Sequence, residues 1–123
     1  MSKRVAVLGA SKNTEKFSNK AVRAYLKQGY TVYPVNPKEE TIERLTAYAS
    51  VLDIPDDLDR ITVYLPPQVT LSVLNEIAEK GTKELFLNPG SESAEVVEKA
   101  RSLGLDPILA CSIIDIGETP KDY

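Results

Sequence analysis

The sequence of 123 residues contains no histidine, no tryptophan and one cysteine, Cys111. Without histidine, the chain can form neither a Ser-His-Asp nor a Cys-His nucleophile system, and it can form no histidine-based metal site. A single cysteine allows neither an internal disulfide nor a thiolate zinc cluster within one chain, and it favours a cytoplasmic location. We therefore expect no metal-ligating residue, and no residue stands out as catalytic.

Long apolar runs are also missing. No run approaches the ~20 residues that a membrane span needs. The first four residues lead directly into an apolar segment, so we expect no signal peptide. The content of 42% hydrophobic and 27% charged residues is ordinary for a globular protein. The sequence thus predicts one domain over residues 1–123, with no membrane partner.

Charge is unevenly distributed along the chain. Residues 1–38 have a balance of +7, whereas residues 39–123 have a balance of −10. Three of the early lysines, Lys12, Lys16 and Lys38, fall in or near predicted turns, which suits a compact polyanion as ligand. The acidic remainder argues against a nucleic-acid surface. Three further basic residues are expected on the solvent-facing side of one helix: Lys20, Arg23 and Lys27.

A strand, a glycine turn and a helix begin the chain. The apolar run over 4–8 predicts a buried strand that ends at Gly9. A small, hydroxyl-rich turn follows, and either Ser18 or Asn19 is expected to cap a helix over 18–28. Together these parts form a cradle for nucleotide phosphates, because backbone N–H groups and the positive end of the helix dipole point at one spot.

Strands and helices then alternate. Gly29 is expected to end the first helix, and further strands are predicted over 30–35, 61–65, 84–87 and 106–110. A second helix begins at Pro66-Pro67 and ends at Gly81, with an apolar face formed by Val69, Val73, Leu74, Ile77 and Ala78. A third helix, with Ser91 as its candidate cap, ends at Gly104, and its apolar face is formed by Val96, Val97, Ala100 and Leu103.

Other segments are less regular. Residues 41–45 are expected to form one helical turn, residues 46–50 a short strand and residues 53–57 a loop, while a polar tail follows Cys111. The alternation predicts a doubly wound α/β domain, with a parallel sheet of about five strands and helices on both faces. In such folds the ligand lies outside the carboxyl ends of the strands. Four loops are expected at that edge: 9–18, 36–40, 65–68 and 88–91.

The turn chemistry narrows the choice of nucleotide. A dinucleotide site would show G-x-G-x-x-G after the first strand, but the turn over 9–14 has one glycine. An NAD site would also have an acidic residue at the end of the second strand, where Asn36, Pro37 and Lys38 stand instead. A lysine there could meet a ribose phosphate. NADP and coenzyme A (CoA) are the candidates that remain.

At this point the sequence resembles a known family, the small stand-alone CoA-binding domain proteins. These are similar to the N-terminal CoA-binding domain of the succinyl-CoA synthetase alpha subunit. The resemblance runs from Val5 to Cys111, and Gly29 to Pro37 is its most specific part. The matching motifs are Gly9-Ala10-Ser11, Lys16-Phe17-Ser18-Asn19, Gly29-Tyr30-Thr31-Val32-Tyr33-Pro34-Val35-Asn36-Pro37, Asp53-Ile54-Pro55, Pro66-Pro67 and Asn88-Pro89-Gly90.

The resemblance implies a Rossmann-like fold that binds CoA at the carboxyl edge of the sheet, and it implies roles for matching positions. Residues 11–14 would hold the pyrophosphate, Lys38 would meet the 3′-phosphate or adenine end, residues 64–67 would wall the adenosine, and residues 88–90 would lie near the pantetheine arm. The candidate binding residues are Gly9, Ser11, Lys12, Asn13, Thr14, Lys16, Ser18, Asn36, Pro37, Lys38, Tyr64, Leu65, Pro66, Pro67, Asn88, Pro89 and Gly90.

The sequence also departs from this family. Members often have Trp-x-Gln-x-Gly where this chain has residues 86–90, with the shorter Asn88 in place of glutamine. Glu43, Arg44 and Leu45 occupy a region where many members have glycine. The synthetase's second domain and its phosphorylated histidine have no counterpart in these residues.

The resulting hypothesis is a module that binds CoA or an acyl-CoA without catalysis of its own, with any protein partner unknown. Two alternatives stay open: an NADP-linked oxidoreductase or acyl-CoA enzyme that uses a tyrosine (Tyr33, Tyr48 or Tyr64) or an aspartate as acid or base, and a subunit that docks a partner. Cys111 also has two interpretations, a small buried hydrophobe or a thiol that forms a mixed disulfide with CoA.

Overall fold

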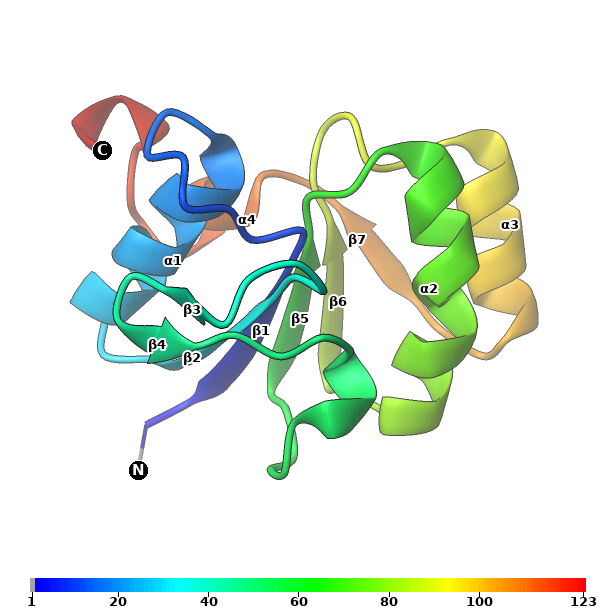
Figure 1. Ribbon diagram of the computed structural model, residues 1–123. Coiled ribbons are helices and arrows are strands. Elements are labelled where there is room, and N and C mark those ends of the chain that lie inside the picture. The colour runs from blue at the N-terminus through cyan, green and yellow to red at the C-terminus, as the bar shows by residue number, and fades with distance from the viewer. Residues whose placement is uncertain (1) are drawn as a thin grey trace.

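The computed structural model describes residues 2–123, which form a five-stranded parallel sheet in the order β2-β1-β5-β6-β7 (Figure 1). The strands of this sheet are β1 (Arg4–Leu8), β2 (Thr31–Val35), β5 (Arg60–Val63), β6 (Glu84–Leu87) and β7 (Pro107–Leu109). Within this part of the chain, no helix is both long and apolar enough to cross a membrane. The predicted doubly wound α/β class is confirmed.

Helices cover both faces of the sheet, as Figure 1 shows. On one face lie α1 (Phe17–Lys27) and α4 (Ser112–Asp115); on the other lie α2 (Pro67–Lys80), α3 (Ala94–Ser102) and the short turn η1 (Val51–Asp53). Two hydrophobic cores result, because successive side chains of a strand point to opposite faces. In β1, Val5 and Val7 pack with α1 and α4, whereas Ala6 and Leu8 pack with α2 and α3.

The prediction of a helical turn over residues 41–45 is wrong. These residues form a two-stranded antiparallel hairpin of β3 (Thr41–Ile42) and β4 (Leu45–Thr46). Its two central residues both have positive φ, 50° at Glu43 and 65° at Arg44, as a type I′ turn requires. The physical reason is tertiary: Ile42 is buried in the core beside α1, and this burial outweighs the helical spacing.

The short strand expected over 46–50 is only partly present. Beyond β4 it is reduced to one parallel bridge between Tyr48 and Val35. Tyr48 N donates to Pro34 O at 2.9 Å, and Asn36 N donates to Tyr48 O at 2.9 Å. This bridge extends the sheet beside β2 and holds the start of the 36–40 loop. The loop expected over 53–57 begins inside η1.

Two predicted helix caps are wrong. α1 begins at Phe17, so Lys16 is its N-cap residue, and Ser18 and Asn19 are buried inside its first turn. α3 is capped by Ser93, whose Oγ accepts a hydrogen bond from Val96 N at 3.1 Å, while Ser91 Oγ donates to Val63 O. The residues expected as caps are therefore buried near the helix starts: Ser18 and Asn19 lie inside α1, and Ser91 bonds to β5.

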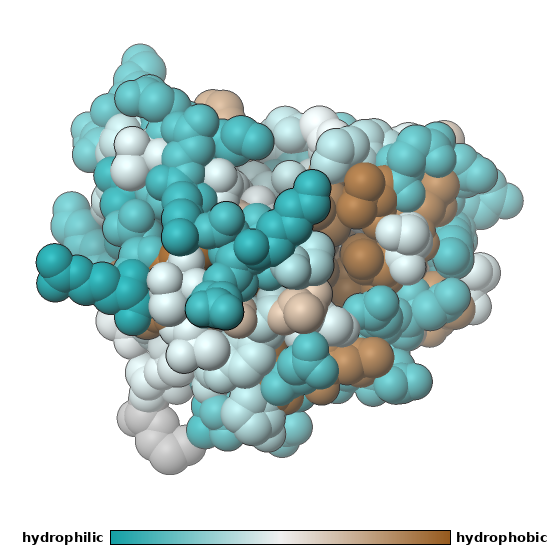
Figure 2. All heavy atoms as spheres, viewed as in Figure 1, coloured by the Kyte–Doolittle hydropathy of each residue, from teal (hydrophilic) through white to brown (hydrophobic). Residues whose placement is uncertain are grey.

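The predicted apolar face of α2 needs one correction. Val69 is 43% exposed, and Figure 2 shows apolar side chains lying open to solvent over α2. Thr70 is buried in its place, with Leu74 and Ile77. Thr70 can be buried because its Oγ1 donates to the carbonyls of Leu65 and Pro66.

The polar tail predicted after Cys111 is wrong as well. Residues 112–115 form α4, which packs on α1, and Pro120–Asp122 form the short turn η2 beside the same helix. Ile113 is fully buried in the core formed with α1. A helix of four residues is too short to leave a periodic pattern in the sequence, and its two isoleucines are the one signal that could have revealed it.

Candidate functional site

A cleft of about 610 Å³ opens at the carboxyl edge of the sheet. It lies over the neighbouring strands β1 and β5, from which the chain crosses to opposite faces. Such a switch point is where open α/β sheets bind ligands. Nine of the predicted residues line the cleft: Gly9, Lys16, Ser18, Tyr64, Leu65, Pro66, Asn88, Pro89 and Gly90.

The turn after β1 needs glycine at its first position. Gly9 has φ +82°, a conformation that favours glycine, and a Cβ there would lie 2.9 Å from Leu65 Cδ2 and 3.1 Å from Tyr64 O. The amides of Gly9 and Ala10 both donate to Val35 O, at 3.1 and 3.2 Å. Gly9 therefore lets the turn pass close to the β5–α2 loop and binds it to the end of β2.

Two side chains of α1 hold the rest of this turn in place. Asn19 Nδ2 donates to Ser11 O at 2.8 Å. Arg23 donates to Asn19 Oδ1 at 2.7 Å and to Thr14 O at 2.9 Å. Arg23 was expected only on the solvent-facing side of a helix, but its guanidinium braces the turn. Inside the turn, Ser11 Oγ accepts a hydrogen bond from Asn13 N at 3.0 Å.

The N-terminus of α1 faces the cleft. The N-cap residue Lys16 makes no side-chain capping hydrogen bond, and Lys16, Phe17 and Ser18 all line the cleft. The first amide groups of a helix lack intrahelical acceptors, and the helix dipole places partial positive charge there. The described residues that line the cleft include no aspartate or glutamate. The electrostatics of this wall therefore favour an anionic group.

On the opposite wall, Asn88 joins three elements. Its side chain is 2% exposed. Nδ2 donates to Thr62 Oγ1 at 2.7 Å and to Val63 O at 2.9 Å, while Oδ1 accepts from Ser112 N at 2.9 Å. Both amide protons are committed within the protein. The exposed part of this loop that faces the cleft is therefore Pro89 and Gly90.

Tyr64 is the tyrosine of the cleft, but its hydroxyl lies inward, within 3.4 Å of Ser112 Oγ. Burial raises the pKa of the Tyr64 phenol well above its ordinary value, so the group is neutral at pH 7. The two other tyrosines considered as acid or base lie outside the cleft lining. Tyr33 donates to Asp56 Oδ2 at 2.5 Å, and Tyr33 and Tyr48 form a tilted aromatic pair.

The loop after β2, residues 36–40, lies beside the cleft but does not line it. Lys12 Nζ lies 2.9 Å from a carboxylate oxygen of Glu39, which joins the loop after β1 to the loop after β2. Asn36 Nδ2 donates to Ala10 O at 2.8 Å, and Asn36 Oδ1 accepts from Lys38 N at 2.7 Å. Lys38 is exposed at this end of the edge. Eight predicted residues stand outside the lining: Ser11, Lys12, Asn13, Thr14, Asn36, Pro37, Lys38 and Pro67.

Five lining residues are absent from the predicted binding set, namely Phe17, Ser91, Cys111, Ile114 and Pro120. Phe17 and Ser91 do lie in loops that were expected at this edge, and Cys111 was considered as a thiol that pairs with CoA. Phe17 is a large apolar residue in an otherwise polar turn, which could have marked it. Ile114 and Pro120 come from the segment interpreted as a tail. Within residues 2–123 no three histidine, cysteine, aspartate or glutamate side chains gather as they would around a metal ion.

Comparisons with known proteins identify relatives of this chain. ADP-forming acetate–CoA ligase II of Archaeoglobus fulgidus is 35% identical over 115 residues, which cover 84% of this chain and 17% of the ligase. The alpha subunit of ADP-forming acetate–CoA ligase I of Pyrococcus furiosus is 34% identical over 134 residues, covering 96% of this chain and 29% of the subunit. The chain thus spans less than a third of the length of these curated relatives.

Solved structures resemble the whole fold. A conserved hypothetical protein from Pyrococcus furiosus has a TM-score of 0.83 at 36% identity, with 94% of this chain and 99% of that chain covered. The dinucleotide-forming acetyl-coenzyme A synthetase 1 of Ca. Korarchaeum cryptofilum has a TM-score of 0.76 at 27% identity, with 89% and 26% covered. The family model described as "CoA binding domain" matches residues 3–116. The chain therefore belongs to the CoA binding domain family.

Proposed function

We propose that this chain binds CoA or an acyl-CoA in the cleft at the carboxyl edge of its sheet. The observation that carries the proposal is the position of that cleft at the β1–β5 switch point, in a chain of the CoA binding domain family. On one side of the cleft are the N-terminus of α1 and the Lys16 ammonium; on the other is a wall of apolar and backbone groups. This arrangement suits a ligand with a phosphate part and a long, mostly neutral arm.

The proposed roles follow the order of the loops along the sheet edge. The turn over 9–16 and the first amides of α1 bind the pyrophosphate. Lys38, in the loop after β2, meets the ribose 3′-phosphate, with Lys12 nearby in its ion pair with Glu39. Tyr64, Leu65 and Pro66 pack against the adenosine. Pro89 and Gly90 lie along the pantetheine arm. Asn88, just before them, holds the start of this loop through its buried hydrogen bonds.

We propose a binding role rather than a catalytic one. Tyr64, the tyrosine that lines the cleft, has a pKa that burial raises, which leaves it a poor base at neutral pH. Incubation with acetyl-CoA, followed by chromatography, tests this part: turnover of the thioester above a buffer control would contradict it. The cytoplasmic location, the single domain over 1–123 and the lack of a nucleic-acid partner stay predictions.

A thermal-shift series with CoA, dephospho-CoA, NADP and NAD tests the ligand. A ligand that binds only the native state stabilises it by about 2.7 kcal/mol at a hundredfold excess over Kd. We expect the largest shift with CoA. A shift with NADP alone would refute the proposal and favour the oxidoreductase, and no shift with any of the four, in protein freed of bound ligand by refolding, would refute both.

The 3′-phosphate contact has its own test. Lys38→Ala should weaken CoA binding by about two- to fivefold, as expected for one exposed charge pair, and should leave dephospho-CoA binding nearly unchanged. Lys3→Ala is the matched control, because Lys3 is an exposed lysine that precedes β1 and so lies at the opposite edge of the sheet. Equal losses for both ligands would exclude Lys38 from phosphate binding.

A further inference from the structure

One side of the cleft has a rim of apolar side chains from three distant segments. Phe17 is the first residue of α1, Ile114 lies in α4 and Pro120 begins η2, and all three line the cleft. Phe17 is 57% exposed and Ile114 is 63% exposed, the highest values among the large hydrophobic residues described. Figure 1 shows the start of α1, α4 and the C-terminal turn on this same side of the molecule. We call these three residues the apolar rim.

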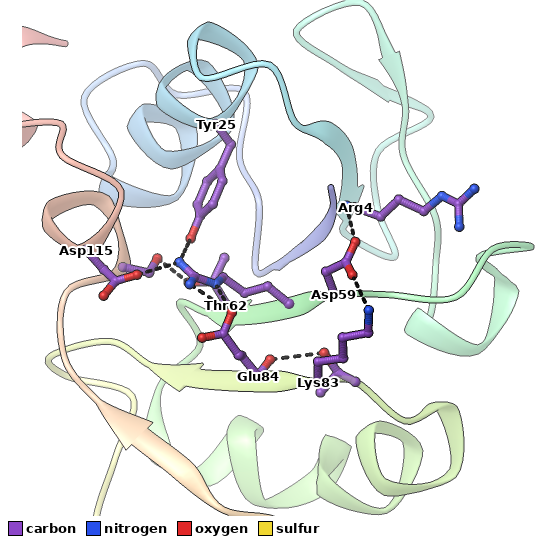
Figure 3. Close-up of polar contacts among 10 residues, drawn as sticks. Arg4, Tyr25, Asp59, Thr62, Lys83, Glu84 and Asp115 are labelled. Carbon is purple, nitrogen blue, oxygen red and sulfur yellow. Dashed lines mark hydrogen bonds and ion pairs between the residues drawn. The ribbon is translucent and has the colours of Figure 1, made fainter. Parts of the chain in front are cut away.

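The structure holds α4, and with it Ile114, firmly in place. Ser112 N donates to Asn88 Oδ1, and Ser112 Oγ lies 2.7 Å from Thr62 Oγ1. At the other end of the helix, Asp115 forms an ion pair of 2.9 Å with the buried Arg60. Figure 3 shows Asp115 reaching from α4 toward the polar cluster that contains Tyr25, Thr62 and Glu84. These contacts position α4 so that the Ile114 side chain is exposed at the cleft.

The other two members of the rim also have contacts at or near them that help to position them. The Lys20 ammonium lies 5.5 Å from the centroid of the Phe17 ring. Glu118, two residues before Pro120, is buried and accepts hydrogen bonds from Tyr123 Oη, at 2.7 Å, and from the Gln28 amide. A preformed apolar surface loses little side-chain entropy when a ligand covers it. The exposed rim therefore has the properties of a binding surface.

The order of the strands indicates which part of a ligand meets this rim. The loops after β2 and β1 contribute Lys38, Lys12 and Lys16, whereas the loops after β6 and β7 contribute Pro89, Gly90 and Cys111. CoA has its phosphates at one end and its thiol at the other. If its phosphates lie at the basic end, as the proposed function requires, its sulfur lies toward Cys111 and the following helix, α4.

We propose that the apolar rim receives the acyl group of an acyl-CoA, so that the chain prefers alkyl thioesters to free CoA. This inference rests on the proposed function. The rim presents only carbon to a ligand, so it would bind a hydrocarbon chain by removing apolar surface from water. Phe17 stands next to Lys16, so its ring would also meet the neighbouring part of CoA, whereas Ile114 and Pro120 would be covered by an acyl chain that extends beyond the sulfur.

Isothermal titration calorimetry with CoA, acetyl-CoA, butanoyl-CoA and hexanoyl-CoA tests the inference. A fully buried methylene improves affinity by about fourfold, and we expect about twofold for each one on this half-open rim. Hexanoyl-CoA has four more methylenes than acetyl-CoA and should therefore bind roughly fifteenfold more tightly. The ratio of the two affinities is the readout, since it cancels contacts that both ligands share.

Variants of the rim should lower this ratio. We expect Ile114→Ser, and separately Phe17→Ser, to reduce it to about threefold or less. Both positions are exposed, and circular dichroism verifies that each variant is folded. Leu109→Ser is the matched control, because Leu109 is 53% exposed on β7 but stands outside the cleft lining, and the wild-type ratio should persist.

Three results would overturn the inference. If the chain bound all four ligands with equal affinity, there would be no acyl site, and the proposed function would stand. A ratio that falls as much in Leu109→Ser as in Ile114→Ser would mean that the acyl chain binds non-specifically. Failure of all four ligands to bind would refute the proposed function first, and the acyl site with it.

Discussion

Replacing Asn88 with alanine should destabilise the whole domain, although the residue lies at the candidate site. The buried side chain links β5, β6 and α4 through three hydrogen bonds. Two of its partners keep other bonds: Thr62 Oγ1 retains Ser112 Oγ, and Val63 O retains Asn88 N and Ser91 Oγ. Ser112 N, which is buried at the start of α4, would lose its acceptor.

The magnitude follows from these three bonds. Two lost bonds whose partners are still satisfied cost about 0.5 to 1 kcal/mol each, and a buried N–H without an acceptor costs about 1 to 3 kcal/mol. We expect a loss of about 3 kcal/mol in the free energy of unfolding. At roughly 3–4 °C per kcal/mol for a domain of this size, the melting temperature should fall by about 10 °C.

Urea denaturation followed by far-UV circular dichroism measures this loss, and suits a chain without tryptophan. Ser91→Ala is the control, because it removes one buried hydrogen bond to Val63 O and leaves that carbonyl bonded to Asn88 N. The control should lose about 1 kcal/mol. If Asn88→Ala lost no more than Ser91→Ala, Asn88 would not be the structural link that its contacts indicate.

Three further predictions concern other parts of the fold. Gly9→Ala should cost about 2 to 3 kcal/mol in urea denaturation, because φ is +82° and the new Cβ would lie 2.9 Å from Leu65 Cδ2; a neutral effect would mean that the turn adjusts freely. Arg60→Met should lower stability by about 1 to 2 kcal/mol in the same assay, since the buried Tyr25 hydroxyl loses its donor and the half-exposed carboxylates of Asp115 and Glu84 lose their partner; unchanged stability would show that these contacts are dispensable. The Tyr123 hydroxyl and the Gln28 amide hold the pKa of Glu118 below its ordinary value of 4.5, so its stabilising contribution is present above pH 4.5 and is lost as the pH falls further. Glu118→Gln should therefore flatten the decline in melting temperature below pH 4.5, and an unchanged acid slope would contradict this.

The sequence predicted the sheet well because each main strand has a local signature. The β-branched run before Pro34 and the apolar segment of β1 can be read without knowledge of the rest of the fold. Glycines 29, 81 and 104 do follow their helices, each with a positive φ that a β-carbon would disfavour. The edge that holds the candidate site follows from this alternation alone.

The parts that could not be predicted depend on contacts distant in sequence. Ile42 belongs to a hairpin because it is buried beside α1, and Ile114 reaches the cleft because α4 is bound to β5 and β6. Asn19 was, with Ser18, one of two residues expected to cap the first helix, since small polar residues usually lie there. It is buried instead, because the turn before α1 needs a donor for Ser11 O. The positions of these residues are determined by tertiary contacts, which have no local signature in the sequence.

The two-sided burial of β1 has a consequence for how the molecule opens. Val5 and Val7 belong to one hydrophobic core and Ala6 and Leu8 to the other, so neither layer of helices can separate without exposing this strand. Amide protons of β1 should therefore exchange with solvent only through global unfolding, whereas those of the short edge strand β7 should exchange through local opening. Since the proposed ligand binds at Gly9, directly after β1, its binding should slow exchange across both layers at once. A ligand bound in the cleft should therefore raise the free energy of unfolding of the whole domain.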